Sequence, residues 1–446
     1  MVKPGKEQHW EAARGLAALL VMFHHSVAAF YHEAVFGVSD DFPGSPVTRL
    51  FTITPLGIVV AAHFAVCFFF VLSGYVLSLK FFGEGAKGRL DVAEAAVKRP
   101  FRLAGIAILS MALSWGLTQM SAHYNAAVAA INGSPWFSEF MTYRPDWHSF
   151  LADVCLVRNG TDYNPPLWTI KVELIGSFLV YGVLFFFRRT PFRFAVYAVL
   201  LVAFQGAIYQ GFLVGILFAD LHINYPSAVL QCRRKWLVWL LLGGSLVFAS
   251  FPYYAAEGWF VNANYLKGTF FGYFPPLPGV GGGYSMLGAV LTFLLILLSQ
   301  RVQSFLNLGV LRYFGRISFA LYAIHFVILT SFTSWLFLVL LQKGLDYDAS
   351  FLLVLAASLV VVVATSEAAT RLVDGPSIQA ANWIGRCFRK AVATIETQWA
   401  GSKNWSVSEK HPEANLVGTP NEPTAVPPLH PGAMRGESHA EQTGAP

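Results

Sequence analysis

Long apolar stretches recur along this chain of 446 residues and limit what it can fold into more than any other feature. Five of them come close to or exceed the length at which an α-helix crosses the hydrocarbon core of a bilayer, namely residues 64–79, 101–120, 236–251, 317–341 and 351–369. Only 13% of all residues are charged, about half the fraction that is typical of soluble domains. The sequence therefore predicts an all-α fold, a polytopic bundle of transmembrane helices.

The positions of the basic residues predict how the helices are oriented. Lysines and arginines gather in alternate connections, among them residues 80–102, 188–193 and 233–235, and the positive-inside rule places these connections in the cytoplasm. Residues 192–220 are too long for one untilted span and are broken by Gly206 and Gly211, so we count them as two short spans. About ten spans result, with both termini on the cytoplasmic side of a cell membrane.

Charge, cysteines and the N-terminal segment each exclude a class of protein. The formal net charge of +6 would suggest a nucleic-acid partner for a soluble protein, but here the basic residues serve as orientation signals, so we expect none. The four cysteines predict neither a disulfide framework nor a metal site. The first apolar helix contains arginine and histidines without a cleavage pattern before it, which favours a retained first span over a signal peptide.

Two outer loops and a C-terminal tail complete the expected organisation. Residues 121–166 and 252–283 are long outer segments, and such loops on a helical bundle commonly bind polar substrates. We divide the chain into a membrane domain, residues 1–395, and a tail, residues 396–446, too short for an appended catalytic domain. The tail is rich in Pro, Glu, Ser, Gly and Thr, which predicts a disordered cytoplasmic segment.

Ionisable side chains inside a bilayer are costly and are functional candidates for that reason. In the first span Arg14 and His25 are eleven positions apart, which puts them within about 20° of one helix face and about 16 Å apart in depth. His24 points about 80° away and is the weaker candidate, although a small change in helix phase would exchange the two histidines. A histidine on an apolar face can equally be a hydrogen-bonded packing residue, so this pair alone leaves both interpretations open.

Two later spans hold further candidates. Glu173 lies just inside the fourth span, after a helix start marked by Pro165 and Pro166, and its carboxylate is expected to face a cavity or a partner. In the ninth span Tyr322 and His325 are three positions apart and share a helix face. A satisfied core histidine is the more common explanation of His325 when it is taken by itself.

A compact cationic group and a pair of small residues complete the set. Lys98, Arg99 and Arg102 lie at the predicted entrance to the third span and suit a phosphorylated ligand, although an orientation signal is the simpler explanation. Ser73 and Gly74 interrupt an aromatic run in the second span. Small residues at such positions usually permit close helix packing, so we do not expect Ser73 to be a nucleophile.

Five motifs, in this order, resemble the acyltransferase-3 family of integral membrane O-acyltransferases, which modify bacterial surface glycans. They are the arginine, ten residues and histidine of Arg14 and His25, the aromatic and Ser-Gly run at 68–75, the paired Arg99 and Arg102, the block from Trp168 to Glu173, and the Ser, Tyr and His block at 317–325. The chain departs from the family pattern at Asp374, where glutamate, one residue and proline are usual. We expect Asp374 to be a helix-end residue.

The resemblance implies a membrane-bound O-acyltransferase that moves an acyl group, expected to be acetyl, from cytoplasmic acyl-coenzyme A to a hydroxyl of an extracytoplasmic carbohydrate or lipid-linked glycan. Lys98, Arg99 and Arg102 would hold the phosphates of the donor, and Arg14 would face it. His25 would be the general base that removes the acceptor proton, because the pKa of imidazole suits a base near neutrality.

The remaining candidates would then contact the acceptor side. Glu173 would orient the acceptor or hold the imidazolium that forms on His25. Trp168, Tyr322 and His325 would bind substrate. No metal and no bound cofactor besides the acyl-coenzyme A donor are expected.

Two other functions stay open on the sequence alone. A proton-coupled transporter would use Arg14, His25 and Glu173 as a relay without acyl chemistry, although no inverted repeat is evident. A sensor or scaffold would use the C-terminal tail to bind partners. An acyl-transfer assay separates the first alternative from an enzyme, and deletion of the tail separates the second.

Overall fold

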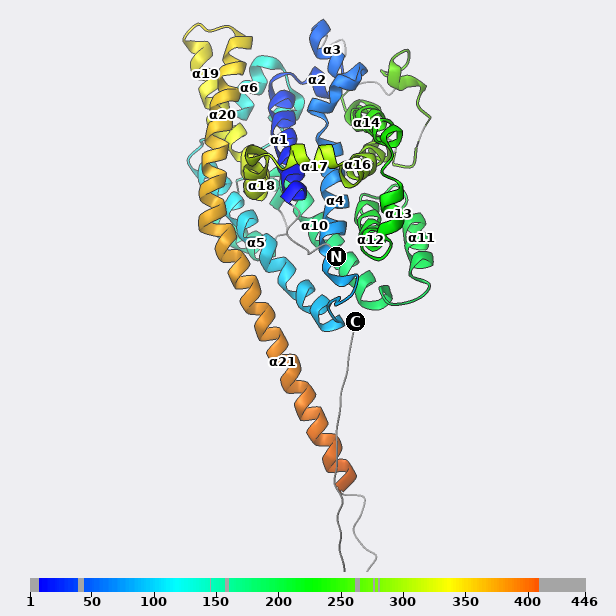
Figure 1. Ribbon diagram of the computed structural model, residues 1–446. Helices are drawn as coiled ribbons and strands as arrows, with labels where there is room; N and C mark the ends of the chain where they lie inside the picture. Colours follow the sequence, from blue (N-terminus) through cyan, green and yellow to red (C-terminus); the bar gives the residue numbers. More distant parts are fainter. Residues whose placement is uncertain are drawn as a thin grey trace, which may run out of the picture. The chain divides into compact units, whose positions relative to one another are not determined.

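A computed structural model describes residues 8–38, 44–144, 146–156, 160–260, 265–275, 277–279 and 281–408, and every regular element in these ranges is a helix (Figure 1). The prediction of an all-α chain is confirmed for this part of the sequence. Six helical runs within it are long and apolar enough to cross a membrane, and a bent pair, Gly282–Leu298 with Gln300–Leu306, raises the number to seven if it forms one span. The two members of that pair meet at 95°.

The six candidate spans follow one another along the chain. They are α1 (Gln8–Phe30), α4 (Ala62–Ser78) with η2 (Leu79–Phe81), α5 (Arg89–Gln119), η3 (Pro165–Leu167) with α10 (Trp168–Phe187), the run of α18 (Gly309–Ile328), η5 (Leu329–Thr333) and α19 (Ser334–Gln342), and the run that begins with α20 (Tyr347–Ala369). The double proline at the predicted start of the fourth span does begin a helix, because η3 leads directly into α10.

Shorter helices make up the rest of the described chain. They are α2 (Glu33–Phe36), α3 (Pro46–Ile53), η1 (Pro55–Val60), α6 (Asn125–Asn132), α7 (Pro135–Ser138), α8 (Trp147–Leu156), α9 (Gly160–Tyr163), α11 (Arg193–Ala203), α12 (Gln210–Asn224), α13 (Pro226–Gln231), α14 (Lys235–Ala249), α15 (Tyr253–Ala256), η4 (Phe270–Tyr273), α16 (Gly281–Leu298) and α17 (Gln300–Leu306). The segment counted as two short spans is indeed two helices, α11 and α12. Because a straight span takes about 20 residues, α11, α12 and α14 fall short of one, and the count of ten spans stays a prediction.

Helix α1 packs between α18 and α4 (Figure 1), and its contact with α18 depends on two glycines. A Cβ atom on Gly15 would lie 2.4 Å from the backbone nitrogen of Gly315, and a Cβ on Gly315 would lie 2.4 Å from the carbonyl oxygen of Glu11. No side chain fits at such a distance, so only glycine lets the two backbones approach this closely.

Small residues also join α4 to α12. A Cβ on Gly74 would lie 2.1 Å from the carbonyl oxygen of Phe212, and one on Gly215 would lie 2.3 Å from that of Val71. The interpretation of Gly74 as a helix-packing residue is therefore confirmed. The same contact turns the neighbouring Ser73 toward the cavity described below.

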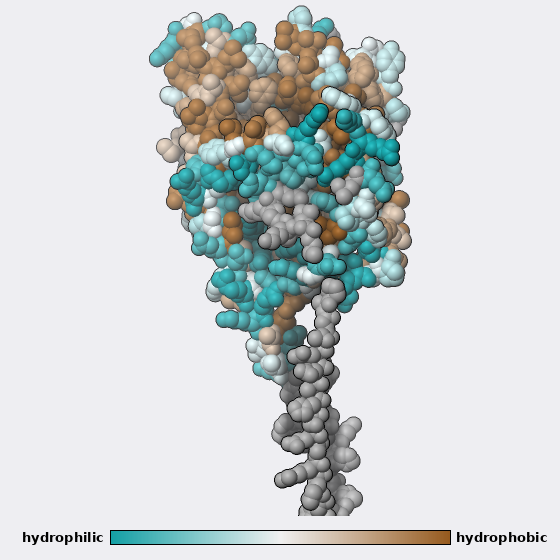
Figure 2. Space-filling model, viewed as in Figure 1, coloured by the Kyte–Doolittle hydropathy of each residue, from teal (hydrophilic) through white to brown (hydrophobic). Residues whose placement is uncertain are grey.

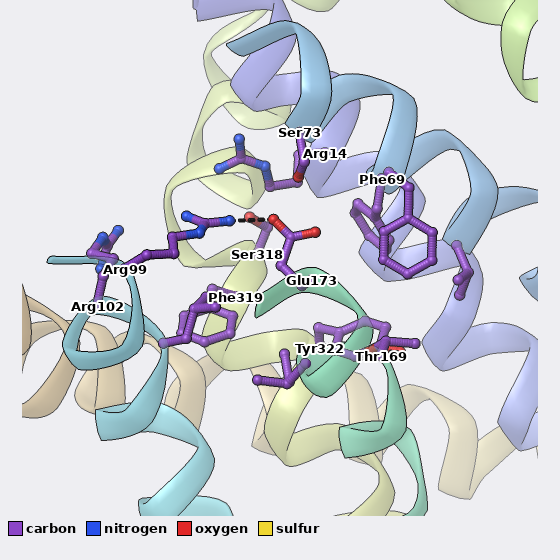
Figure 3. Close-up of a pocket in the computed structure, with 14 residues that line it drawn as sticks. Arg14, Phe69, Ser73, Arg99, Arg102, Thr169, Glu173, Ser318, Phe319 and Tyr322 are labelled. Carbon is purple, nitrogen blue, oxygen red and sulfur yellow. Dashed lines mark hydrogen bonds and ion pairs between the residues drawn. The ribbon is translucent and has the colours of Figure 1, made fainter. Parts of the chain in front are cut away.

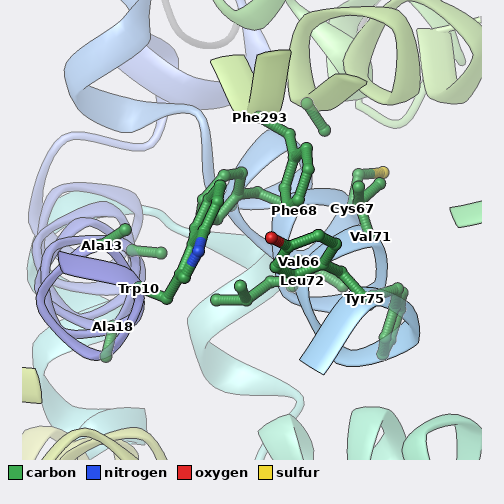
Figure 4. Close-up of a cluster of buried hydrophobic side chains, with 14 of the residues drawn as sticks. Trp10, Ala13, Ala18, Val66, Cys67, Phe68, Val71, Leu72, Tyr75 and Phe293 are labelled. Atoms are coloured by element: carbon green, nitrogen blue, oxygen red, sulfur yellow. The ribbon is translucent and has the colours of Figure 1, made fainter. Parts of the chain in front are cut away.

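The largest hydrophobic core joins α1, α4 and α16 through buried aromatic rings (Figure 4). The indole of Trp10 stacks on the ring of Phe293 with centroids 4.4 Å apart, and the ring of Tyr75 lies 5.2 Å from the same indole. Aromatic pairs at these separations contribute beyond the area that they bury. This core holds the N-terminal half of α1 in place.

Large apolar side chains also point away from the bundle, as expected for helices in contact with lipid. Val202 is 72% exposed, and Trp239 and Val360 are each 68% exposed. Figure 2 shows hydrophobic residues gathered over the upper part of one face and hydrophilic residues across its lower part. Apolar surface of this kind is stable in a hydrocarbon solvent, which agrees with a membrane protein.

Two predicted helix boundaries are wrong. The third span was expected to begin at residue 101, but α5 begins at Arg89, where the Asp91 carboxylate caps the backbone N–H of Gly88 at 2.7 Å, and Pro100 lies inside the helix. The last helix was expected to end at Asp374, but α20 continues through a π-helical turn, η6 (Thr370–Asp374), into α21 (Gly375–Ser408). Both predictions relied on short sequence patterns. Proline is tolerated inside a membrane helix, and a π turn lets a helix continue past residues such as 370–374.

The chain divides into two compact units, Met1–Ala391 and Val392–Pro446. Residues 396–408, which the sequence assigned to a disordered tail, are helical and belong to α21. Residues 409–446, the rest of that tail, lie outside the described residues, so the prediction of disorder there stays a prediction.

Candidate active site

A cavity of about 140 Å³ lies between α1, α4, α5, α10 and α18 (Figure 3). Its lining combines charged, hydroxyl-bearing and apolar side chains. They are Arg14, Arg99, Arg102 and Glu173, then Ser73, Thr169, Ser318 and Tyr322, then Val66, Phe69, Phe70, Leu103, Ile170 and Phe319. The structure therefore brings four of the predicted site residues with a charge into one cavity, although they come from three different helices.

A buried ion pair organises the charged end of the cavity. Arg99 of α5 donates from Nη2 to the Glu173 carboxylate of α10 and from Nε to the Ser177 hydroxyl, the latter at 2.8 Å. The side chains of Arg99 and Glu173 are only 15% and 13% exposed. Such a pair fixes both groups, because removing either one would leave the other charge buried and uncompensated.

A second ion pair holds Arg102. Its Nη1 donates to the Asp374 carboxylate at 2.5 Å, and the two side chains are 36% and 12% exposed. Asp374 lies on the π-helical turn η6, and π turns often occur at functional positions. The expectation that Asp374 is a helix-end residue is therefore wrong. It pairs with Arg102 of the cavity, which is 272 residues away in the sequence.

Lys98 does not share this cavity with the two arginines. Its ammonium group pairs with Glu94 of the same helix at 3.0 Å, and Glu94 also accepts from Arg389 of α21. The predicted cationic group of three is thus divided. Arg99 and Arg102 face the cavity, whereas Lys98 takes part in the contact between α5 and α21.

Arg14 differs from the other two cavity arginines. The described residues provide its guanidinium with neither a hydrogen bond nor an ion pair, although Arg14 is half-buried and lies beside Glu173 and Arg99 (Figure 3). A guanidinium group carries five donors in a planar fork that suits phosphate or carboxylate. The charged end of the cavity is therefore equipped to hold an anion.

Tyr322 marks the opposite, mostly apolar end of the cavity. Its hydroxyl lies 2.9 Å from that of Thr169 and donates to the carbonyl oxygen of Pro166 at 3.3 Å. Its ring lies 5.7 Å from that of Phe69. These contacts join α18 to the start of α10 and leave one face of the tyrosine to the cavity.

The two histidines singled out in α1 and α18 contact each other. Nδ1 of His25 lies 2.8 Å from Nε2 of His325, and the rings are almost parallel, with an angle of 8° between them. His24 instead bonds through Nδ1 to the carbonyl oxygen of Val60 at 2.5 Å and is fully buried. The helix phase is thus settled, with His25 directed toward another functional candidate and His24 in a packing position.

The segment 121–166, which was predicted to be an outer loop, covers His25. Trp136 of α7 lies over the imidazole with ring centroids 5.9 Å apart and planes 16° apart, and Phe326 of α18 meets the same ring edge-on. Trp136 was not among the predicted site residues, because no spacing in the sequence connects a residue of this loop with the first span. The richness of the loop in aromatic residues was the one available signal.

Glu173 and Trp168 lie in surroundings that differ from those expected for their predicted roles. Glu173 was expected to orient the acceptor or hold the His25 imidazolium, but among the described residues its carboxylate binds Arg99, and the ring that bonds to His25 is that of His325. Trp168 was expected to bind substrate, but its side chain is 41% exposed and does not line the cavity. Thr169 and Glu173, four residues apart on α10, face the cavity, whereas Trp168 is turned away from it.

Comparison with known proteins gives two matches. A family model described as an acyltransferase domain matches residues 8–367, which include every residue that lines the cavity. Acyltransferase clz18 from Cochliobolus lunatus is 26% identical over 339 residues, which cover 65% of this chain and 72% of that protein. No solved structure matches the chain.

Proposed function

We propose that this chain, which belongs to the acyltransferase family matched by its residues 8–367, transfers an acyl group from cytoplasmic acyl-coenzyme A to a hydroxyl of an extracytoplasmic carbohydrate or glycolipid. The group transferred is expected to be acetyl. Family membership itself establishes an acyl-transferring membrane enzyme and confirms the resemblance found in the five motifs. The donor, the acyl group and the acceptor are the parts that we propose.

The observation that carries the proposal is the distance along α1 between Arg14, at the charged end of the cavity, and His25, the proposed base. Arg14 lines the cavity with Arg99 and Arg102, and His25 lies eleven residues further along α1, about 16 Å away. Coenzyme A has the same division, because an extended arm separates its phosphates from its thioester. A donor held by the arginines could therefore present its acyl carbon close to His25.

The walls of the cavity support this placement of the donor. Val66, Phe69 and Phe319 add apolar surface to the cavity that the arginines and Tyr322 line, and Tyr322 is one helical turn from His325. Apolar walls with a few polar groups at the ends are typical of small-molecule sites. In this arrangement Glu173 holds Arg99 in position for the phosphates and does not itself touch the reacting atoms.

The chemistry that we propose balances without an external proton. His25 takes the proton of the acceptor hydroxyl, while the hydroxyl oxygen forms a bond to the acyl carbon of the thioester. The carbon–sulfur bond then breaks, and the thiolate that leaves takes the proton from His25. The products are the ester and free coenzyme A thiol, and His25 returns to its starting state without a covalent intermediate.

A direct proton relay between Arg14, His25 and Glu173 would place these side chains in contact with one another. Arg14 and His25 are about 16 Å apart along α1, and Glu173 pairs with Arg99. This arrangement favours the enzyme over the transporter.

The experiment that tests the proposal uses purified full-length protein in lipid vesicles with acetyl-coenzyme A labelled in the acetyl group. We expect label to appear on a polysaccharide or glycolipid fraction and coenzyme A thiol to be released. Analysis of surface glycans from cells with and without the protein then identifies the acceptor. If label is transferred from another acyl-coenzyme A but not from acetyl-coenzyme A, the transferred group is not acetyl. No transfer from any acyl-coenzyme A would overturn the donor assignment.

A further inference from the structure

The direction of the hydrogen bond between the two histidines follows from a third group. Nδ1 of His325 lies 3.1 Å from the carbonyl oxygen of Leu321, an atom that can only accept, so Nδ1 carries the proton. A neutral imidazole has a single N–H, which leaves the lone pair of His325 on Nε2. Because this Nε2 lies 2.8 Å from Nδ1 of His25, His25 must be the donor in that bond.

The basic nitrogen of His25 is its Nε2. With its proton on Nδ1, neutral His25 carries its lone pair on Nε2. Among the described residues none makes a hydrogen bond to Nε2 of His25, and the side chain is half-buried, whereas His325 is 2% exposed. Both ring nitrogens of His325 therefore make hydrogen bonds, whereas Nε2 of His25 stays available to a substrate.

The helix contact explains why the two rings meet. Gly15 and Gly315 touch where α1 crosses α18, and each is followed ten residues later by its histidine. Ten residues of α-helix span about 15 Å, so two helices that run in the same direction from this contact bring His25 and His325 to the same level. The register of the pair is thus set by backbone contact and does not depend on the rings themselves.

We propose that His325 is a positioning residue for the acyl transfer, one that fixes the tautomer of His25 so that Nε2 faces the acceptor hydroxyl. This inference rests on the proposed function, and it assigns to His325 a role other than the substrate contact expected from the sequence. When His25 takes the acceptor proton on Nε2, its Nδ1–H bond to His325 remains and supports the imidazolium. The proton later leaves from Nε2 to the thiolate, and His325 stays neutral throughout.

A carboxylate often orients a catalytic histidine in enzymes, and here a neutral ring backed by a helix carbonyl does so. The aromatic surroundings give a physical reason. His25 lies among Trp136, Phe326 and His325, where an ionised carboxylate would be expensive to bury. A neutral acceptor orients the base without that cost.

The test compares two substitutions at one position. His325→Leu has similar volume and no hydrogen-bonding group, whereas His325→Gln keeps an oxygen that can accept from Nδ1 of His25. We expect His325→Leu to lower kcat about 100-fold with little change in KM for either substrate, and His325→Gln to recover about 10-fold of that loss. Both are measured in the vesicle assay with labelled acetyl-coenzyme A.

A matched control and a double variant separate positioning from packing. His24→Leu also removes a buried histidine and its bond to a backbone carbonyl, and it should leave kcat within about 3-fold of the unmodified protein. His325→Leu combined with His25→Ala should be no slower than His25→Ala alone, because His325 acts through His25.

Equal losses of kcat in His325→Leu and His325→Gln, or a rise in KM without a change in kcat, would overturn the proposal and leave His325 as a packing or substrate-binding residue. Failure of the unmodified protein to transfer any acyl group would instead refute the proposed function. The two failures are therefore distinguishable.

Discussion

Arg14 and His25 lie on one face of α1, but the surroundings of Arg14 are charged and those of His25 are uncharged and aromatic. Around Arg14 the cavity holds two further arginines and Glu173, and ion pairs to Glu173 and Asp374 fix the other two cations. Around His25 the neighbours are His325, Trp136 and Phe326, none of which carries a formal charge. A single helix thus connects an ionic region with a neutral, aromatic one.

In the proposed mechanism, this difference separates the binding of a charged ligand from proton transfer. An anionic donor needs fixed cations, and carboxylate partners hold two of the three cavity arginines, Arg99 and Arg102, while the site is empty. A base must be neutral in order to accept a proton, and nearby fixed cations would oppose its protonation. Placing the two about 16 Å apart on α1 satisfies both requirements.

The largest expected effect tests the neutral end. His25→Ala removes the proposed base, and we expect acyl transfer to fall about 100- to 10,000-fold while the protein stays folded in the membrane. His24→Ala, at the adjacent position, should be much milder, because its ring only bonds to the carbonyl of Val60. Transfer rates and thermal stability of both variants provide the measurement. Near-normal transfer by well-folded His25→Ala protein would show that His25 is not the general base.

The next effect tests whether the contact between Gly15 of α1 and Gly315 of α18 sets the position of both Arg14 and His25. Gly315→Val would push α1 away from α18 at the crossing, and overpacking of this kind costs about 1–3 kcal/mol of stability. We expect kcat to fall at least about 10-fold, because the His25–His325 contact is disturbed as well. Gly182→Val is the matched control, since a Cβ there meets no heavy atom within 4 Å. Equal behaviour of the two variants in melting temperature and kcat would contradict the register argument.

A smaller effect tests the ionic end. Arg99→Ala combined with Arg102→Ala removes two of the three cavity cations, and we expect KM for the donor to rise about 10-fold or more with less change in KM for the acceptor. Lys98→Ala is the control, because its ammonium binds Glu94 outside the cavity and should not affect donor use. Initial rates over a range of donor concentrations decide the matter. An unchanged donor KM in the double variant would return these arginines to the role of orientation signals.

The smallest effect concerns the second ion pair. Asp374→Asn removes the charge opposite Arg102, which is 36% exposed, so the pair is worth about 1 kcal/mol or less and the donor KM should change by only about 3-fold. Asp374→Glu should restore the unmodified value, because it keeps the charge. A 100-fold effect of Asp374→Asn would show that the carboxylate contacts a substrate directly.

Sequence patterns determined the features that depend on residues close together in the chain. Hydrophobic runs predicted the long helices, because the length of apolar sequence needed to cross a bilayer is fixed by the helical rise. Helical periodicity also placed Arg14 and His25 on one face, and five motifs in order indicated the family that the match over residues 8–367 confirms.

Helix boundaries were predicted less well. The apolar stretch that was expected to begin at residue 101 lies inside α5, which begins at Arg89, and Asp374, expected at a helix end, lies in a π turn. The signals at these positions are local, but neighbouring helices decide whether a break in backbone hydrogen bonding is tolerated.

Only the tertiary structure decided which candidates meet. His25 bonds to His325, Arg102 to Asp374, and Lys98 turns away to Glu94. The first two pairs are 300 and 272 residues apart, and their contact depends on where the helices cross, as Gly15 and Gly315 do for the histidines. Periodicity specifies which face of a helix a residue occupies, but the partner of that face is set by the close packing of whole helices, which no spacing within one segment encodes.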